Sequence, residues 1–298
     1  MPFTMKKYLF LFFITTSLQA SSQDVHEPIE EPVYMTFKAE DNEQAHDIHR
    51  MYTLKPAVDI PIIATGTLWS AYAFTKIYSK DKIPDEKVAG LRTEDINAFD
   101  RWAAGNSSPS MDANSNYLFY GSIPLPGLLF IDKDIRKDAL PVTALYWESF
   151  AITGMLYTGS AYFIDRYRPE TYDTRQPVAH RTSGNNKNAF LAGHVAVVAN
   201  ATFFMAKIYS DYHPNSNWKW VFWGGATLAT GTMIYMRHEA GKHFPTDLIA
   251  GTALGTLSGI LVPHFHKTKH PAERKWSLGP SFNNRGRGIG VSFSYALR

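Results

Sequence analysis

Long apolar blocks separated by short polar loops fill most of this chain and limit what it can fold into. Between residues 57 and 264 the blocks are rich in apolar, aromatic and small residues, and the loops are rich in Asp, Asn, Pro and Ser. Because the blocks lack the strict alternation and β-branched enrichment of strands, they favour helices. The blocks cover residues 57–78, 117–131, 139–164, 189–209, 221–236 and 247–262. We therefore predict an all-α bundle of about six helices.

The composition excludes several classes of protein. The chain has 298 residues, of which 45% are hydrophobic and 19% charged, so it can bury one sizeable core. Its formal net charge is only +3, without a long basic run, and no nucleic-acid partner is expected. Because the chain contains no cysteine, it cannot form disulfides, thiolate metal sites or a cysteine nucleophile.

The first 22 residues have the order of features found in an export signal. Lys6 and Lys7 precede an apolar run over residues 8–14, and small residues follow at positions 20–22. The run is shorter than the roughly 20 residues that a membrane span needs. We predict a signal peptide over residues 1–22, and hence a protein of the cell envelope with its site facing the periplasm.

The rest of the chain divides into three parts. Residues 23–56 are polar and acidic and are predicted to form an extended lead-in segment. Residues 57–266 form the predicted helical domain, and residues 267–298 begin as a basic connector. In that last part, a turn signal at residues 283–286 precedes apolar and small residues that alternate over residues 291–297. This alternation predicts a short C-terminal β-hairpin-like tail.

Three glycines in the last apolar block recur every four residues. Gly251, Gly255 and Gly259 would lie on one face of a helix, with no side chain to hold a neighbour away. We therefore expect a second helix to approach this face closely.

The sequence leaves open whether the blocks cross a bilayer or form a soluble bundle. Several are near or below the lower limit of roughly 17 residues for a span, and Asp59 and Glu148 interrupt others. Trp218, Trp220 and Trp223 fit either a belt at a membrane interface or an ordinary core. Contact with a membrane is expected in either case.

Polar residues gather at three of the predicted helix ends. Residues 165–169, with the sequence Asp-Arg-Tyr-Arg-Pro, follow one block, and residues 192–194, with the sequence Ala-Gly-His, open the next. Arg237, His243 and Asp247 span the final loop. Guanidinium groups match two phosphate oxygens at once, and a helix N-terminus supplies backbone donors. The three elements together therefore suit a phosphate oxyanion.

The two histidines suggest a reaction. A neutral imidazole can attack phosphorus if a hydrogen bond to its other nitrogen fixes the tautomer, and Asp247 could accept that bond from His243. His194 could then donate a proton to the leaving oxygen.

The order Arg-Pro, Gly-His and Arg-x5-His-x3-Asp resembles the type 2 phosphatidic acid phosphatase (PAP2) and vanadium haloperoxidase superfamily. The superfamily pattern is Lys-x6-Arg-Pro, Pro-Ser-Gly-His and Ser-Arg-x5-His-x3-Asp, and the match covers residues 161–247. The resemblance implies a helical bundle of that type, with His243 forming a phosphohistidine, Asp247 orienting it and His194 acting as general acid. The phosphate-binding residues that it implies are Arg168, Arg237 and the amide of Gly193.

Three positions depart from the superfamily pattern. Ala161 replaces the lysine, Leu191 and Ala192 replace Pro-Ser, and Met236 replaces the serine before Arg237. Loss of one preorganised donor typically slows an enzyme about 10² to 10³-fold, so reduced activity is one expectation. The cations near enough in sequence to replace the lysine charge are Arg166, Lys187 and Lys242.

No metal or cofactor is expected. His238-Glu239 with His243 has a separation of five residues, whereas a zinc-binding helix needs four. Three further histidines lie beside two lysines, which is more consistent with a solvated basic connector than with a metal site. They are His264, His266 and His270.

The leading hypothesis is an exported phosphatase that hydrolyses a phosphomonoester or a lipid (pyro)phosphate through a phosphohistidine. The first alternative is a vanadate-dependent haloperoxidase, in which His243 would ligate vanadate, although the missing lysine argues against tight capture. The second is a weakly active or silent envelope protein that keeps the fold. The expected partner is a phosphorylated lipid or small phosphoester, and the oligomeric state is left open.

Overall fold

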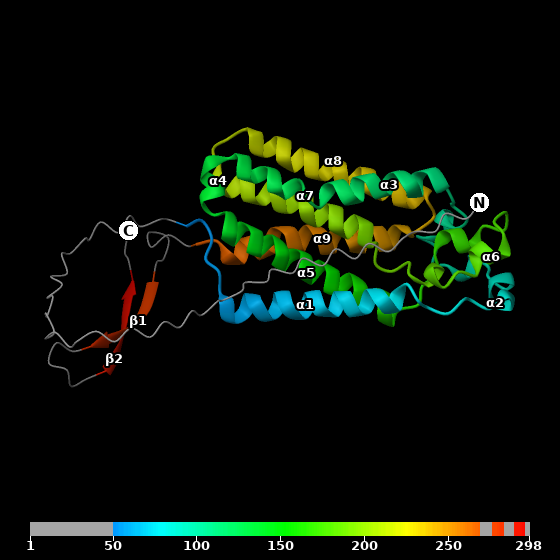
Figure 1. Ribbon diagram of the computed structural model, residues 1–298, viewed down its shortest axis with the longest axis horizontal. Helices are drawn as coiled ribbons and strands as arrows, with labels where there is room; N and C mark the ends of the chain where they lie inside the picture. Colours follow the sequence, from blue (N-terminus) through cyan, green and yellow to red (C-terminus); the bar gives the residue numbers. More distant parts are fainter. Residues whose placement is uncertain (1–49, 269–275, 283–288, 296–298) are drawn as a thin grey trace, which may run out of the picture. The chain divides into compact units, whose positions relative to one another are not determined.

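The computed structural model describes residues 50–268, 276–282 and 289–295 (Figure 1). These residues contain nine α-helices and one pair of strands. The long helices are α1 (Pro56–Ile77), α3 (Pro109–Ser122), α5 (Ala139–Phe163), α7 (Gly193–Tyr212), α8 (Trp218–Glu239) and α9 (Pro245–His266). The short helices are α2 (Asp85–Ala89), α4 (Lys133–Lys137) and α6 (Val178–Arg181).

Each predicted block contains or overlaps one long helix, but the expected number of helices is too low. The three additional helices are only four or five residues long and lie in polar connecting segments, where no apolar period marks them. The all-α prediction for the helical domain therefore holds, and the count of about six is corrected to nine α-helices in the described part of the chain.

The second block is the one whose boundaries are wrong. A continuous segment was expected over residues 117–131, but α3 begins earlier, at Pro109, where Ser108 accepts a hydrogen bond from the N–H of Met111 at 3.4 Å. Residues Leu125–Ile131 form a 3-10 helix instead. The Pro124-Leu125-Pro126-Gly127 sequence explains the break, because each proline lacks the N–H that continues an α-helix.

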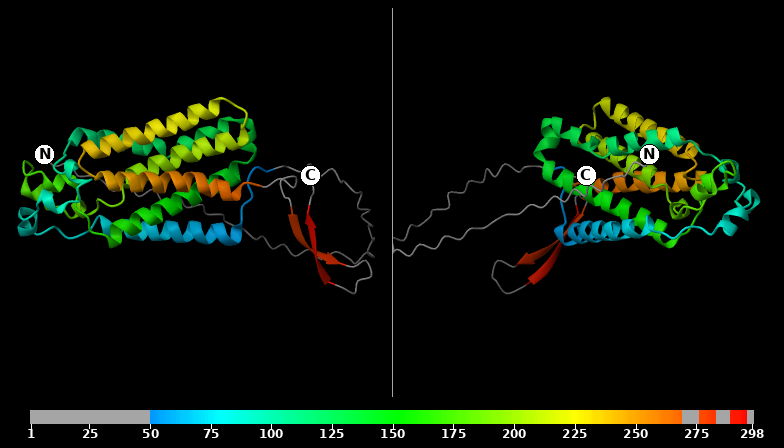
Figure 2. Two further views of the ribbon diagram at one scale, coloured as in Figure 1. Left: turned by 180° about the vertical axis from the view of Figure 1, so that it is seen from behind. Right: turned by 45° about the vertical axis from the view of Figure 1, so that its right-hand side comes forward.

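Helix α7 is the central element of the bundle. It packs against α3, α5, α8 and α9, while α1 packs mainly on α5 (Figure 2). Several side chains of α7 are completely buried, among them Phe204 and Ile208, which join Val142 and Leu145 of α5 in the main core cluster. A helix buried on most of its surface holds its N-terminus in a fixed position, and this matters for the site described below.

The glycines of α9 lie against the backbone of α7, as the spacing predicted. A Cβ atom at Gly251 would lie 2.6 Å from the carbonyl oxygen of Ala192, and one at Gly255 would lie 2.1 Å from that of Ala196. At Gly259 the nearest atom would be the carbonyl oxygen of Asn200, at 2.6 Å. The two helices therefore touch through backbone atoms along this face, and only glycine fits there.

Replacing Gly255 by alanine is expected to destabilise the protein by about 1 to 3 kcal/mol, because the added methyl group overlaps a backbone atom that cannot move alone. Gly225→Ala in α8 is the matched control, since nothing lies within 4 Å of its added Cβ. The control is expected to stabilise the helix by up to about 1 kcal/mol. Unfolding in detergent, followed by circular dichroism, measures both; equal stability of the two variants would contradict the close contact.

The lead-in segment is described only from residue 50. Tyr52 is buried, and its hydroxyl donates to a carboxylate oxygen of Asp211 at 2.7 Å. The N–H of Thr53 donates to the carbonyl of His266 at 2.9 Å. This end of the segment is therefore attached to the end of α9. The predicted signal peptide, residues 1–22, lies outside the described residues.

The C-terminal part contains two strands, β1 (Trp276–Phe282) and β2 (Ile289–Tyr295). They pair antiparallel, with Trp276 opposite Tyr295 and Phe282 opposite Ile289. The turn expected at residues 283–286 lies outside the described residues.

Candidate active site

All three polar elements of the sequence lie at one end of the bundle. The C-terminal ends of α5 and α8 and the N-terminal ends of α3, α7 and α9 meet there, at the right in Figure 1. Helix α7 supplies His194 and Gly193 in its first turn, and α8 supplies Arg237 in its last. The loop between α8 and α9 supplies His243.

The end of α8 explains the spacing between Arg237 and His243. Gly241 has φ +67°, a left-handed conformation, and a Cβ there would lie 1.8 Å from the carbonyl of Asn106. The N–H groups of Gly241 and Lys242 donate back to the carbonyls of His238 and Arg237, at 3.0 and 3.2 Å. This is a Schellman helix end, which reverses the chain direction. It returns His243 toward the last turn of α8, beside Arg237.

The tautomer of His243 is set by a backbone carbonyl. Its Nδ1 lies 2.6 Å from the carbonyl oxygen of Ala189, which can only accept a hydrogen bond, so Nδ1 carries the proton. The Nε2 atom of the neutral ring therefore keeps its lone pair. Backbone hydrogen bonds hold Ala189 in place. Its N–H donates to the carbonyl of Arg166, and the N–H of Arg168 donates to the carbonyl of Asn186.

The predicted hydrogen bond from His243 to Asp247 is wrong. The carboxylate of Asp247 accepts from the backbone N–H of Phe244 at 2.8 Å and pairs with the guanidinium of Arg166. Asp247 is the third residue of α9, and such a residue commonly reaches back to cap the start of its helix. Capping of α9 thus explains the spacing of four residues between His243 and Asp247. Asp247 binds the backbone of Phe244, the residue after His243, and not the His243 ring.

His194 lies at the edge of an apolar cavity. Its Nε2 is 3.1 Å from the side-chain oxygen of Asn116, and its ring lies against Phe119, with centroids 4.4 Å apart. The cavity has a volume of about 490 Å³ and is lined by residues of α1, α3, α5 and α7. Gly193 also lines it, where a Cβ would lie 2.6 Å from the ring of Tyr157. As the first residue of α7, Gly193 has an N–H without an intrahelical acceptor.

Both predicted phosphate-binding arginines are buried and keep a free donor. The Nη1 of Arg237 donates to Asp112 at 2.7 Å and to Ser115 at 3.0 Å, while Arg168 lies 3.8 Å from Glu170. The Nε groups of Arg168 and Arg237 have no hydrogen-bond partner among the described residues. A buried N–H without an acceptor is costly, and an anion between the two arginines would satisfy both.

The pKa values of these groups reflect their burial and a shared positive charge. Burial lowers the pKa of His243 well below its usual range, and the positive charges of Arg237 and Arg168 lower it further. Burial and the same two arginines lower the pKa of His194 to about 3. Burial alone would raise the pKa of Asp112, but Lys242 and Arg237 hold it below its usual range. Arg237 and Arg168 thus act on both histidines, which places the four predicted residues around one positive region.

Arg166 does not supply the positive charge of the lysine that Ala161 replaces. Its guanidinium binds Asp100 at 2.6 Å and also pairs with Asp247, so it braces the start of α9. Lys242 is better placed: its Nζ lies 2.8 Å from Glu170 and 3.3 Å from Asp112, the partner of Arg237. Lys242 therefore remains a candidate for the missing lysine charge, and so does Lys187.

Sequence reasoning missed several residues that shape the site. Asp112 and Asn116 lie on α3, more than 75 positions before their partners, and no motif marks them. Their spacing of four along one helix, with Ser115 between them, was the only available signal. Ala189 acts through its carbonyl, which no side-chain pattern reveals.

The prediction that His266 belongs to a solvated basic connector is wrong. His266 is only 7% exposed, whereas His264, two residues earlier, is exposed. Among the described residues, a buried group able to hold a metal ion consists of His266 with Asp59 and Glu148, far from the candidate active site.

The chain is similar to two known phosphatases. The lipid A 4'-phosphatase of Porphyromonas gingivalis is 30% identical over 121 residues, which cover 40% of this chain and 46% of that protein. The chain thus matches about half the length of this curated relative. A transmembrane PAP2-type phosphatidylglycerolphosphate phosphatase from Bacillus subtilis is 18% identical, with a TM-score of 0.41 over 70% of this chain and 94% of that one. The PAP2 superfamily model matches residues 143–271, so this part of the chain, which contains the predicted site residues, is similar to that superfamily.

Proposed function

We propose that this protein is an exported, membrane-associated phosphatase that hydrolyses a lipid phosphomonoester or pyrophosphate through a phosphohistidine. One observation carries the proposal: two buried guanidinium groups with free Nε donors act electrostatically on the imidazole of His243, whose Nδ1 donates to Ala189 and whose Nε2 lone pair is therefore available. The superfamily match and the lipid A 4'-phosphatase relative support it.

The reaction would take place in two steps. The Nε2 of His243 attacks phosphorus and forms an N–P bond, while the bond from phosphorus to the leaving oxygen breaks. That oxygen takes a proton from His194. Water then attacks the phosphohistidine, gives a proton to His194, and releases phosphate. Arg168 and Arg237 hold the charge that develops on the phosphoryl oxygens.

Substrate binding would prepare His194 for its role. In the free protein, burial and the two arginines keep its pKa at about 3, so it is neutral near pH 7. A dianionic phosphate opposes the charge of both arginines, which removes their part of that depression and leaves the part due to burial. Binding of the phosphate is therefore expected to raise the pKa of His194 and to favour its protonated form.

The apolar cavity supports a lipid substrate. It begins at His194 and Gly193 and is lined largely by aromatic and aliphatic side chains, such as Phe119 and Phe150. Apolar pockets of this kind bury the hydrocarbon part of a ligand. A phosphate held by the arginines would thus leave its acyl or prenyl chain in this cavity.

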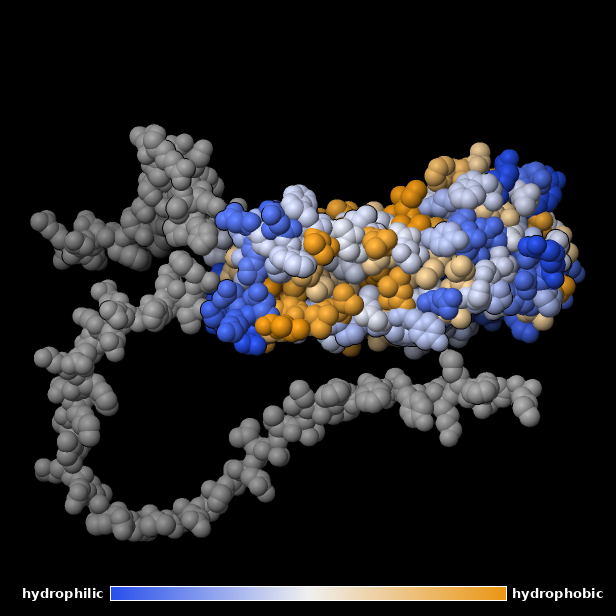
Figure 3. All heavy atoms as spheres, turned by 90° about the horizontal axis from the view of Figure 1, so that it is seen from above, coloured by the Kyte–Doolittle hydropathy of each residue, from blue (hydrophilic) through white to orange (hydrophobic). Residues whose placement is uncertain are grey.

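The surface supports membrane contact. Figure 3 shows apolar residues along the middle of one face of the bundle and hydrophilic residues toward its two ends. Within the described residues, α1 and α9 are long and apolar enough to cross a membrane. Trp218 and Trp220, which could have been core residues, are 66% and 67% exposed, as expected of residues at a membrane interface.

Val197→Trp should test the proposed lipid cavity. Val197 lines it one turn after His194, and the larger ring would fill part of the space. We expect kcat/KM to fall about 10-fold or more for a long-chain lipid phosphate and to stay unchanged for a short soluble phosphoester. Phosphate release by the purified protein across a panel of both substrates provides the measurement.

Val221→Trp is the control, because Val221 is exposed on α8 and away from the cavity. Equal losses on long and short substrates would contradict the lipid cavity. A parent protein that releases no more phosphate than its His243→Ala variant, on every substrate of the panel, would contradict the phosphatase itself and favour a silent envelope protein.

A further inference from the structure

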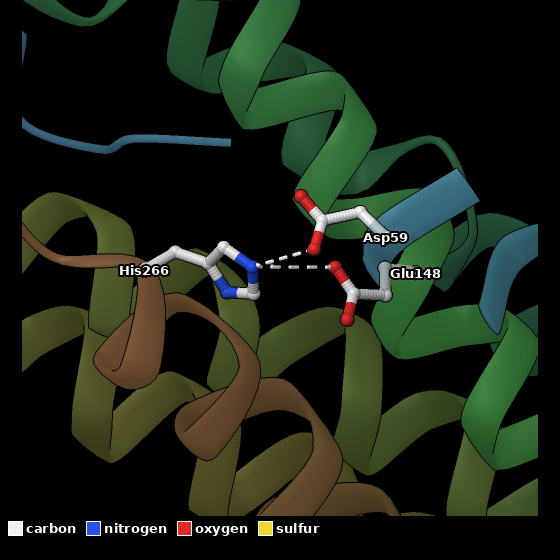
Figure 4. A group of neighbouring side chains, drawn as sticks. All are labelled: Asp59, Glu148 and His266. Carbon is white, nitrogen blue, oxygen red and sulfur yellow. Dashed lines mark hydrogen bonds and ion pairs between the residues drawn. The ribbon is translucent and has the colours of Figure 1, made fainter. Parts of the chain in front are cut away.

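A second polar cluster lies at the opposite end of the bundle from the candidate active site. Asp59 comes from the first turn of α1, Glu148 from α5 and His266 from the last residue of α9 (Figure 4). The three residues are 4%, 4% and 7% exposed. Three ionisable groups brought together in an apolar bundle need a specific reason, because buried charges are costly unless they are paired or bind a metal.

The hydrogen bonds of His266 fix the position of its lone pair. Its Nδ1 lies 2.8 Å from the carbonyl oxygen of Val262, which can only accept, so Nδ1 carries a proton. The Nε2 of the neutral ring would then present a lone pair. It lies 3.0 Å from Oδ1 of Asp59 and 3.8 Å from Oε2 of Glu148. In that state three electron-rich atoms face one another, and either a proton on Nε2 or a metal cation must lie between them.

Glu148 gives an independent sign of an absent ligand. Its Oε2 is buried and has no hydrogen-bond partner among the described residues, although it points toward Nε2 of His266 (Figure 4). Asp59, by contrast, is anchored on its other side, where Oδ2 accepts from the backbone N–H of Lys55 at 2.6 Å. One oxygen from each carboxylate is thus directed to the imidazole nitrogen: Oδ1 of Asp59 at hydrogen-bond distance, and Oε2 of Glu148 without a hydrogen-bond partner among the described residues.

We propose that Asp59, Glu148 and His266 bind one divalent transition-metal cation of the Zn²⁺ type. The three ligand atoms lie within 4.8 Å of one another, close enough for one ion to reach all three. One imidazole and two carboxylates are ligands that such ions accept, with a water completing the coordination. Two negative carboxylates, a neutral imidazole and a divalent cation also give a site with no net charge, which suits burial.

The surroundings of the cluster resemble those of known metal sites. A metal-binding histidine usually donates its second nitrogen to a carbonyl or carboxylate, as His266 does to Val262. An ion also needs a way in. A cavity of about 360 Å³ is lined by Glu148 and His266, together with apolar residues of α5 and α9.

The cation would join three helices and take no part in phosphate hydrolysis. His266 follows Asp247 by 19 positions along α9, so the two ends of this helix are about 28 Å apart. The ion would tie the start of α1 to α5 and to the end of α9. It is therefore expected to stabilise the fold, and its loss should affect stability before it affects the chemistry of His243.

The test uses the full chain, purified in detergent without a histidine tag and treated with a chelator. Co²⁺ is added as a probe, because its visible absorption reports the ligands that it binds. Zn²⁺ content is then measured by mass spectrometry, and thermal unfolding is followed with and without Zn²⁺. Glu148→Gln and His266→Gln remove one ligand each with little change in volume.

His213→Gln is the matched control, since His213 faces one carboxylate, Asp132, at 3.0 Å, and belongs to no three-ligand group among the described residues. We expect the parent and His213→Gln each to bind one equivalent of Zn²⁺ per chain. Both should unfold at a higher temperature with Zn²⁺ than without it. Affinity should fall at least about 100-fold in the two cluster variants.

Two results would overturn the proposal. In one, the chelator-treated parent takes up no Zn²⁺ or Co²⁺, which would mean that the cluster holds only a proton. In the other, the cluster variants bind the metal as tightly as the parent does. If one variant does not fold, Asp59→Asn replaces it, and circular dichroism of each sample confirms that the comparison is between folded proteins.

Discussion

His243→Ala is expected to reduce phosphate release from a lipid phosphate by at least about 10³-fold, with the helical content unchanged. The loss should be this large because the imidazole would form the covalent bond to phosphorus, and the other neutral imidazole near both arginines, His194, has its Nε2 bonded to Asn116 and is assigned to proton transfer. Removing the ring also frees the carbonyl of Ala189, which lies 2.6 Å from Nδ1. Water can replace that one hydrogen bond, so the effect on stability should be modest.

His264→Ala is the control, because His264 is exposed near the far end of α9. A second measurement distinguishes the nucleophile from a residue that only binds phosphate. Brief mixing with a ³²P-labelled substrate, followed by denaturation, should leave acid-labile label on the parent and none on His243→Ala. If His243→Ala keeps more than a tenth of the parent's activity, another group must attack phosphorus and the proposed reaction is wrong.

The acidic side of the pH profile follows from the environment of His243. Burial and two arginines hold its pKa well below the usual range. The ring therefore stays neutral and nucleophilic as the pH falls through 6.5, where an exposed histidine would gain a proton. A loss of kcat/KM near pH 6.5 would thus have to come from another group, such as the second ionisation of the phosphate.

The helical part of the fold could be predicted because apolar runs reflect burial directly. The close contact of α9 with α7 was visible as well, since glycines at a spacing of four have few other uses in an apolar helix. The boundaries of α3 were not visible. Its first half is polar, and the apolar residues after Pro124 suggested a helix where two prolines and a glycine prevent one.

The candidate site was predictable to the extent that side chains define it. The spacing of Arg237, His243 and Asp247 pointed to residues that the structure places at one end of the bundle, but the reasons for the spacing lie in the backbone. A Schellman turn at Gly241 sets the first interval, and the cap at the start of α9 sets the second. The partner of His243 is a carbonyl, and every residue has one, so the sequence could not single it out.

Arg237 explains how a site without the superfamily's lysine and serines could still act. Its guanidinium is fixed by Asp112 and Ser115, which lie on α3 and are held by that helix. An arginine held in place needs no reorganisation when charge develops in the transition state, and preorganised donors of this kind contribute most to catalysis. Part of the function of the missing donors would thus be supplied by a well-supported arginine.

Arg237→Ala is accordingly expected to lower kcat/KM by about 10² to 10³-fold, and Arg237→Lys should recover little, because an ammonium cannot bind two phosphoryl oxygens in one plane. Asp112→Asn keeps the hydrogen bond to Arg237 but removes a charge, and should cost about 10-fold or less. Arg175→Ala is the control, since Arg175 is an exposed side chain that pairs with the buried Asp173 and not with Arg237 or its partners, and should leave kinetics unchanged. Steady-state rates on one lipid phosphate order the four variants. If Arg237→Ala loses no more activity than Arg175→Ala, the free Nε donor of Arg237 does not face the reacting phosphate.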